Sequence, residues 1–340
     1  MTAVSPSTVI GKYQIIKRLG GGAFGDVYHA FDLALRVEKA VKILNPVVGV
    51  SVDDQLAEAR VLAECTHKHI VSINEANVYD IGGQFHVVLD LEYIPEGSLE
   101  SAMQNRWLSL QQAIGSVRGA LLGLEFAHSS GFIHRDVKPG NIMLSPNCAK
   151  LSDFGLATQV GSQPAGVVQG YTPHLPPEFF VNGRTSEQSD VYGAGITLFR
   201  AVNSIRDWRA VLSATPDVQR HIENGTLVKT IGYGRHVPDS VRRIINKACA
   251  ARAASRYQSA GEFGQKLDGL RFGIQWVKAA PDVWIGVQGS LGYSASVDSR
   301  RNEVVVKKNG RRVNSLCSNH ASHSDAMESL EDYVSRSSLT

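Results

Sequence analysis

The chain has 340 residues, of which 43% are hydrophobic, and its formal net charge is +3. This length allows about two domains, and the apolar share is ample for a buried core. The charge is close to neutral for the size, so it gives no reason to expect bulk binding to nucleic acid. The four cysteines have no C-x-x-C spacing, which indicates neither a disulfide framework nor a zinc site.

The first predicted element is a pair of strands, residues 13–19 and 27–31, around a glycine cluster. The pattern G-x-G-x-x-G-x-V is formed by Gly20, Gly22, Gly25 and Val27. Alone, such a cluster also marks an ordinary hairpin turn. Because strands stand on both sides, the cluster favours a hairpin that lies over nucleotide phosphates. A dinucleotide site would instead lead from a strand into a helix.

The next predicted strand covers residues 37–44, and its alternation puts Ala40 and Lys42 on one face. A small residue there would admit an adenine ring, while the Lys42 ammonium would reach the phosphates. Glu58 follows in a predicted helix, on a face that it shares with apolar residues. A buried carboxylate needs a cation, so we predict an ion pair between Glu58 and Lys42. The alternatives are a solubilising lysine and a solvated glutamate.

The central segment His-Arg-Asp-Val-Lys-Pro-Gly-Asn, residues 134–141, is followed by Asp153-Phe154-Gly155. Phosphoryl transfer needs a carboxylate beside the attacking hydroxyl, a cation near the phosphate and oxygen ligands for magnesium. Asp136 supplies the carboxylate and Lys138 the cation, while Asn141 and Asp153 supply the metal ligands. Each residue alone is most often a turn former. The ordered set favours phosphoryl transfer.

These motifs resemble a eukaryotic-like (Hanks-type) serine/threonine protein kinase of the bacterial branch, over residues 13 to about 270. The resemblance implies an α+β, bilobal fold, with a small β-rich N-lobe and a large helical C-lobe. It implies ATP and Mg²⁺ as cofactors, with Mn²⁺ as an alternative metal. The implied acceptor is a serine or threonine of another protein or of the kinase itself. The implied adenine site and hinge consist of Val27, Ala40, Met143, the gatekeeper Leu91, Glu92 and Ile94.

Farther along, Pro176-Pro177-Glu178 matches the family's A-P-E triplet, and Arg256 is placed to pair with Glu178. Asp190 matches the aspartate that anchors the catalytic loop from the helix below it. The apolar run at residues 191–202 predicts a buried central helix. The hydroxyls of the loop before the triplet are few, so we predict weak dependence on loop phosphorylation, or dependence on Ser162 alone.

The C-terminal part predicts a small antiparallel sheet with one helix, after a boundary at residues 279–282. We predict strands at residues 283–287, 292–297, 303–307 and 312–316, and a helix at 325–335 capped by Ser324. Asn309-Gly310 predicts a tight hairpin. The basic residues gather on this hairpin and the acidic ones on the helix. They either pair with one another or leave the hairpin free to dock an acidic partner.

The predicted organisation is a tail at 1–12, a kinase domain at 13–271 and an accessory domain at 272–340. The N-lobe covers residues 13–92 and the C-lobe 95–271. Residues 1–11 do not resemble a signal peptide, and no run approaches the ~20 apolar residues that cross a bilayer. We therefore expect a soluble, cytoplasmic kinase with no membrane partner. The alternative from another class is a pseudokinase-like scaffold that binds nucleotide without transfer.

Overall fold

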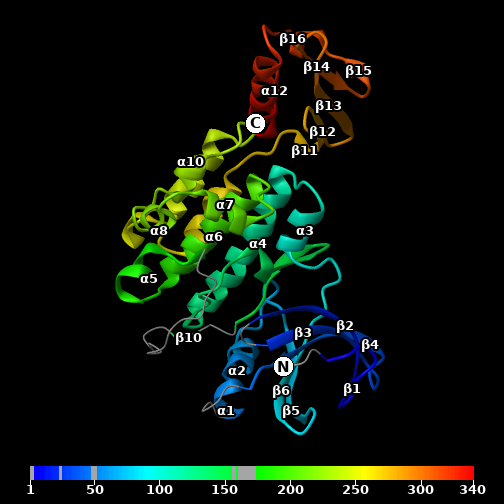
Figure 1. Cartoon of the computed structure of the whole chain (residues 1–340), viewed down its shortest axis with the longest axis vertical. Helices are drawn as coiled ribbons and strands as arrows, with labels where there is room; N and C mark the ends of the chain where they lie inside the picture. The colour runs from blue at the N-terminus through cyan, green and yellow to red at the C-terminus, as the bar shows by residue number, and fades with distance from the viewer. Residues whose placement is uncertain (1–3, 23–24, 47–51, 155–157, 160–173) are drawn as a thin grey trace.

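The computed structural model describes residues 4–22, 25–46, 52–154, 158–159 and 174–340. Figure 1 shows three regions along the long axis: a β-rich lobe, a helical lobe and a small sheet with one helix at the opposite end. This arrangement confirms the predicted α+β, bilobal architecture with an added sheet-and-helix unit.

The N-lobe is a six-stranded antiparallel sheet in the order β1-β2-β3-β4-β6-β5. Its strands are β1 Val9–Ile10, β2 Tyr13–Gly22, β3 Gly25–Asp32, β4 Val37–Leu44, β5 Ile73–Asp80 and β6 Phe85–Leu91. The helices α1 (Val52–Gln55) and α2 (Ala57–Glu64) lie between β4 and β5. Alternate residues of β3 and β4, among them Tyr28 and Val41, are fully buried and form the core of this lobe.

The glycine cluster forms the end of a β-hairpin, as the sequence predicts. The strands are longer than expected, because the glycines themselves continue the ladder: Gly20 pairs with Val27, and Gly22 with Gly25. Gly25 has φ 152°, and a Cβ there would lie 2.2 Å from the carbonyl oxygen of Ile43. Only glycine fits this approach of β3 to β4.

The C-lobe is built around two long helices. Its helices are α3 Leu99–Asn105, α4 Leu110–Ser129, α5 Pro177–Asn182, α6 Glu187–Val202, α7 Trp208–Ala214, α8 Val218–Glu223, α9 Leu227–Ile231, α10 Asp239–Ala248 and α11 Ala260–Asp268. Helix α6 is buried from Ser189 to Val202, which confirms the predicted central helix. A capping box at Ser109 and Gln112 begins α4. Among the described residues, no helix is long and apolar enough to cross a membrane.

The C-lobe also contains four short strands. They are β7 Phe132–Ile133, β8 Ile142–Ser145, β9 Cys148–Leu151 and β10 Thr158–Gln159. Strand β7 pairs with β10, and β8 pairs with β9. The loop between β7 and β8 contains residues 134–141 of the sequence motif, so the fold holds this motif between two anchored strands.

The C-terminal unit is an antiparallel sheet in the order β11-β12-β13-β14-β15, with β16 also paired to β14. Its elements are β11 Gln275–Ala280, β12 Val283–Gln288, β13 Leu291–Asp298, β14 Glu303–Lys308, β15 Arg311–Arg312, β16 Ser318–Asn319 and α12 His323–Ser338. Asn309 and Gly310 have φ 48° and 77°, which confirms the hairpin. Buried Leu330 and Val334 of α12 face the sheet core.

Three details of that prediction are wrong. Residues 279–282 are no boundary, because Ala279 and Ala280 end β11 and the next two residues form the turn into β12. The last predicted strand shrinks to Arg311–Arg312, followed by a 3₁₀ turn at Asn314–Leu316. The cap of α12 is Ser322, whose hydroxyl accepts the backbone N–H of Asp325 at 3.1 Å. The capping pattern fits either serine, so sequence alone does not separate them.

The acidic residues of α12 do not pair with the basic hairpin. Glu328 and Asp332 lie 2.8 and 3.8 Å from the guanidinium of Arg235 in the C-lobe. Glu331 lies 3.2 Å from Lys278 of β11. The helix carboxylates therefore join the C-terminal unit to the C-lobe and to its own first strand, and the basic hairpin is exposed.

Candidate active site

The loop between β7 and β8 brings three predicted site residues together. The Lys138 ammonium lies 2.5 Å from Oδ2 of Asp136. The Asn141 amide nitrogen donates to the backbone oxygen of Asp136 at 2.9 Å and to its Oδ2 at 3.0 Å. The carboxylate of Asp136 is therefore held from two sides. Only 11% of its side chain is exposed, so its orientation is fixed by these contacts.

The loop is anchored from below by Asp190 of α6. Its Oδ1 accepts the backbone N–H of Arg135 at 2.7 Å, and its Oδ2 accepts that of His134 at 2.8 Å. The Nε2 atom of His128 lies 2.7 Å from the same Oδ2. A Cβ at Gly193 would lie 3.0 Å from the carbonyl oxygen of Val137, so glycine lets the loop pack directly on α6.

A second contact joins the two lobes. The Lys42 ammonium of β4 lies 2.8 Å from Oδ1 of Asp153, which follows β9. Asp153 has φ 65°, a left-handed conformation that turns its carboxylate toward the N-lobe. The next residue, Phe154, packs edge-on against His134, with ring centroids 4.7 Å apart. Glu58 lies in α2, but its side chain is outside the described part of the structure, so its pair with Lys42 stays a prediction.

Burial and charge act on the two aspartates in opposite directions. Burial raises the pKa of Asp136 above its ordinary value, and the Lys138 ammonium opposes part of that shift. Burial would also raise the pKa of Asp153, but the adjacent Lys42 ammonium outweighs it and lowers that pKa. Asp153 therefore remains a carboxylate at neutral pH, whereas Asp136 is the better proton acceptor of the two.

Asn141 and Asp153 fit a magnesium site in chemistry and orientation. The amide nitrogen of Asn141 donates to Asp136, which leaves its amide oxygen directed away from that residue. Among the described residues no donor contacts this oxygen. The Asp153 side chain is 38% exposed and offers its second oxygen. Mg²⁺ is usually held by one or two protein oxygens together with substrate phosphates and water, so these two ligands suffice from the protein side.

The predicted adenine-site residues lie on strands of both lobes and on the segment between the lobes. Ala40 pairs with Leu91 across β4 and β6, and Val27 pairs with Lys42 across β3 and β4. Met143 lies in β8 and bridges to Ser98 before α3. The register therefore places Val27 beside Lys42, and Ala40 beside the segment that links the lobes.

In that linking segment, Ile94 is buried, and Glu92 has a partner that the sequence did not reveal. The Lys150 ammonium of β9 lies 2.7 Å from each carboxylate oxygen of Glu92. This ion pair ties the linker to the C-lobe. The two residues are 58 positions apart in the chain, and no local motif connects them.

The loop before the Pro-Pro-Glu triplet includes Ser162, which lies outside the described residues, so the expected phosphorylation behaviour stays a prediction.

The Pro-Pro-Glu triplet itself begins α5, and Arg256 binds Glu178 through both terminal guanidinium nitrogens at 2.9 and 2.7 Å. The Ser189 hydroxyl donates to the same carboxylate at 2.7 Å. This largely buried network connects α5, α6 and the segment before α11.

Comparison with known proteins agrees with this geometry. Residues 13–263 match the family model of the protein kinase domain. The chain therefore belongs to the protein kinase family. It is 30% identical to the serine/threonine-protein kinase PknA of Mycobacterium tuberculosis over 275 residues, which cover 78% of this chain and 63% of PknA.

Other relatives point the same way. The serine/threonine-protein kinase PrkC of Bacillus subtilis is 29% identical over 331 residues, which cover 89% of this chain and 49% of PrkC. The chain thus spans less than two thirds of the length of these relatives. Crystal structures of the M. tuberculosis PknI kinase domain superpose with a TM-score of 0.55 over 78% of this chain and 98% of that domain, at 21% identity, which supports the fold.

Proposed function

We propose that this chain transfers the γ-phosphate of ATP, with Mg²⁺, to a serine or threonine hydroxyl of a protein, its own chain included. The observation that carries the proposal is the hydrogen-bonded group of Asp136, Lys138 and Asn141, together with the contact between Lys42 and Asp153 across the lobes. Positioning and charge stabilisation are what a largely dissociative phosphoryl transfer requires of a protein.

Each residue has a role that its surroundings support. Asp136 accepts the proton of the substrate hydroxyl, and its raised pKa suits a proton acceptor. Lys138 lies within reach of the same hydroxyl and neutralises charge on the transferring phosphate. Lys42 holds the α- and β-phosphates. Asn141 and Asp153 hold Mg²⁺, which when bound neutralises phosphate charge.

Nucleotide recognition completes the proposal. The glycine hairpin of Gly20, Gly22 and Gly25 covers the phosphates with backbone N–H groups. The adenine lies between Val27 and Ala40 on one side and Met143 on the other. These assignments follow from the resemblance, and the strand register supports them, since it places Val27 next to Lys42.

A matched pair of lysines on β4 tests this proposal. Lys42→Ala should lower the transfer rate by about 10²-fold or more, because it removes a positioning charge. Lys39 lies on the face of β4 opposite to that of Ala40 and Lys42, and its ammonium is 3.3 Å from Asp90. Lys39→Ala is therefore the control, with transfer retained. Wild-type protein that binds ATP but transfers no phosphate would favour the pseudokinase-like alternative.

For the C-terminal unit, residues 272–340, we propose a docking role for an acidic partner. Its basic residues on and beside the hairpin are all exposed: Arg300, Arg301, Lys307, Lys308, Arg311 and Arg312. The α12 carboxylates that would neutralise them pair elsewhere. Arg312 contacts Glu303, so the test should leave it intact. Lys307→Glu with Arg311→Glu should abolish salt-sensitive partner capture and leave autophosphorylation unchanged; unchanged capture would contradict docking.

A further inference from the structure

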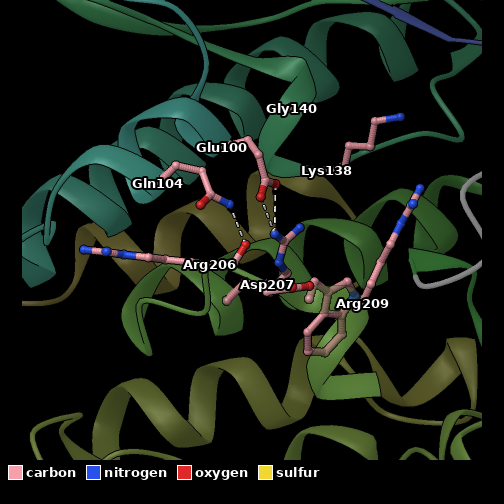
Figure 2. A pocket seen from close by; sticks show the side chains of 9 residues that line it. Glu100, Gln104, Lys138, Gly140, Arg206, Asp207 and Arg209 are labelled. Carbon is pink, nitrogen blue, oxygen red and sulfur yellow. Dashed lines mark hydrogen bonds and ion pairs between the residues drawn. The ribbon is translucent and has the colours of Figure 1, made fainter. Parts of the chain in front are cut away.

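The hollow of about 390 Å³ beside the catalytic loop, shown in Figure 2, is lined mainly by charged side chains. Much of this charge is paired within the protein. Arg200 binds both carboxylate oxygens of Glu100, at 2.7 and 2.8 Å, and Lys138 lies against Asp136. The C-terminal sheet differs from the hollow, because apolar and cationic side chains share one of its exposed faces.

The C-terminal sheet already binds one amphipathic helix on the face that we call inner. Helix α12 lies on one side of the sheet (Figure 1), and its Leu330 and Val334 belong to the same buried cluster as Trp284 of β12. The Glu331 carboxylate of α12 lies 3.2 Å from the Lys278 ammonium of β11. The inner face therefore holds an acidic amphipathic helix by apolar packing and by a carboxylate that pairs with a strand lysine.

The opposite, outer face carries an apolar patch. Because strand side chains alternate, Val283, Ile285 and Val287 of β12 point away from the side of Trp284. Ile285 and Val287 are 47% and 55% exposed. Val277 of β11 pairs with Ile285 and extends the patch. A sheet face in water is normally polar, so this patch is a candidate binding surface.

The register leads from the apolar patch to a cation. Ile285 pairs with Ser294 of β13, and Ser294 pairs with Lys307 of β14. Neighbouring strands are about 4.8 Å apart, so the backbones at Ile285 and Lys307 are about 10 Å apart, which matches the diameter of a helix. Lys307 is exposed, and among the described residues it takes part in no ion pair. Glu303, at the end of the same strand, pairs with Arg312.

We propose that the outer face of this sheet binds an amphipathic helix of a partner protein, with apolar residues packed on Ile285 and Val287 and a carboxylate paired with Lys307. The inference rests on the docking role proposed for this unit, and it names the surface and the form of the acidic partner. The outer face offers the same two kinds of contact by which the inner face holds α12.

Other occupants fit this face less well. A second copy of the chain is disfavoured, because its own acidic helix α12 is packed on the inner face and its Glu328 and Glu331 are paired. Strand addition at the β15 edge is disfavoured, because β15 has 2 residues and a 3₁₀ turn follows it. An acidic helix from another protein satisfies both the patch and Lys307.

Synthetic peptides of about 18 residues, or five helical turns, test the proposal with the full chain. The first peptide forms a helix with leucine on one face and glutamate along one flank. The second has the same composition in an order that breaks the apolar face, the third has lysine in place of glutamate, and the fourth carries two central prolines. Fluorescence anisotropy should give the first peptide a Kd about 10-fold or more below each of the others. Equal affinity of the first and second peptides, or of the first and fourth, would overturn the proposal.

A double variant locates the apolar contact. Ile285→Thr with Val287→Thr keeps β-branched side chains and removes apolar surface, so it should weaken binding of the first peptide by about 10-fold. Val9→Thr with Val78→Thr is the matched control, because these valines are 51% and 41% exposed on strands of the N-lobe, and binding should not change. Thermal unfolding checks that each variant is folded. Unchanged binding by the Ile285 and Val287 variant contradicts docking on this face.

A charge reversal locates the ionic contact. Lys307→Glu should weaken the glutamate peptide and strengthen the lysine peptide, each by about 5-fold. Arg243→Glu is the matched control, because Arg243 is exposed on α10, and it should change neither affinity. If Lys307→Glu leaves both affinities as they are in the wild type, the assigned carboxylate contact is wrong.

The docking role itself fails by a different result. A polyglutamate peptide of the same length carries the charge without an apolar face. If it binds as tightly as the first peptide, docking of an acidic partner stands and the helix site on the outer face is wrong. If no acidic peptide binds, both proposals fail. Autophosphorylation, measured in parallel, tests phosphotransfer independently of either result.

Discussion

The carboxylate of Asp190 accepts the backbone N–H of Arg135 at 2.7 Å, and Arg135 has a left-handed φ of 70°. Non-glycine residues rarely adopt this conformation, which costs of order 1–3 kcal/mol unless the surroundings impose it. Asp190 imposes it by holding two successive backbone N–H groups, those of His134 and Arg135. The direction in which Asp136 leaves the loop therefore depends on a residue in α6.

Asp190→Ala should reduce the free energy of unfolding by about 2–5 kcal/mol, because it leaves buried N–H groups without an acceptor. Urea unfolding measures this loss. Asp190→Asn retains one acceptor oxygen and should lose less. An alanine variant as stable as the wild type, with normal activity, would show that the loop does not need this anchor.

The stabilising effect of Asp190 should depend on pH. Burial would raise the pKa of Asp190, but its bonds to His128 and to the loop outweigh burial and lower it. A lowered pKa in the folded state means that the stabilisation is present above the ordinary aspartate pKa of about 3.9 and is lost as pH falls below it. Unfolding measured against pH should show this loss in the wild type and not in Asp190→Asn.

Lys138→Met should lower kcat. It should also shift the acidic limb of the profile of kcat/KM against pH to higher pH. Asp136 must be ionised to accept a proton, and burial already raises its pKa while Lys138 holds it down. Removal of the ammonium leaves burial less opposed, so the pKa rises further. The profile of kcat/KM against pH measures the shift. A limb that stays in place, or moves to lower pH, would contradict this coupling.

Arg256→Met should destabilise the protein by about 2–4 kcal/mol, because it leaves the Glu178 carboxylate, only 19% exposed, without its cation. Thermal or urea unfolding measures the loss. The double variant Glu178→Gln with Arg256→Met removes both charges and should recover part of it. Equal destabilisation by the single and double variants would show that the pair contributes through packing alone.

The sequence predicts features that depend on neighbours in the chain. Asp136, Lys138 and Asn141 lie within six residues of one another, so a short loop brings them together in any fold that contains it. The glycine hairpin and the Asn309-Gly310 turn are local in the same sense. Ion pairs between distant segments are different. Glu92 with Lys150, and Glu100 with Arg200, meet only through tertiary packing, and no spacing rule identifies them.

The C-terminal unit shows the same limit. Its hairpin and helix are predictable from turn and amphipathic patterns, whereas β11 is missed because residues 279–282 predict a boundary with the first strand after it. Pairing of Trp276 with Gly286 and of Val277 with Ile285 makes this segment a strand. The partners of the α12 carboxylates were also unpredictable, because Arg235 belongs to the C-lobe.

The proposed phosphoryl transfer to serine or threonine depends on Asp136. The most direct measurement compares wild type and Asp136→Asn for transfer from γ-labelled ATP with Mg²⁺, followed by phosphoamino-acid analysis. We predict label on serine or threonine in the wild type, and a loss of about 10²- to 10⁴-fold in the variant, with an unchanged unfolding transition. Equal transfer by the two proteins, or no transfer by the wild type, would contradict the account.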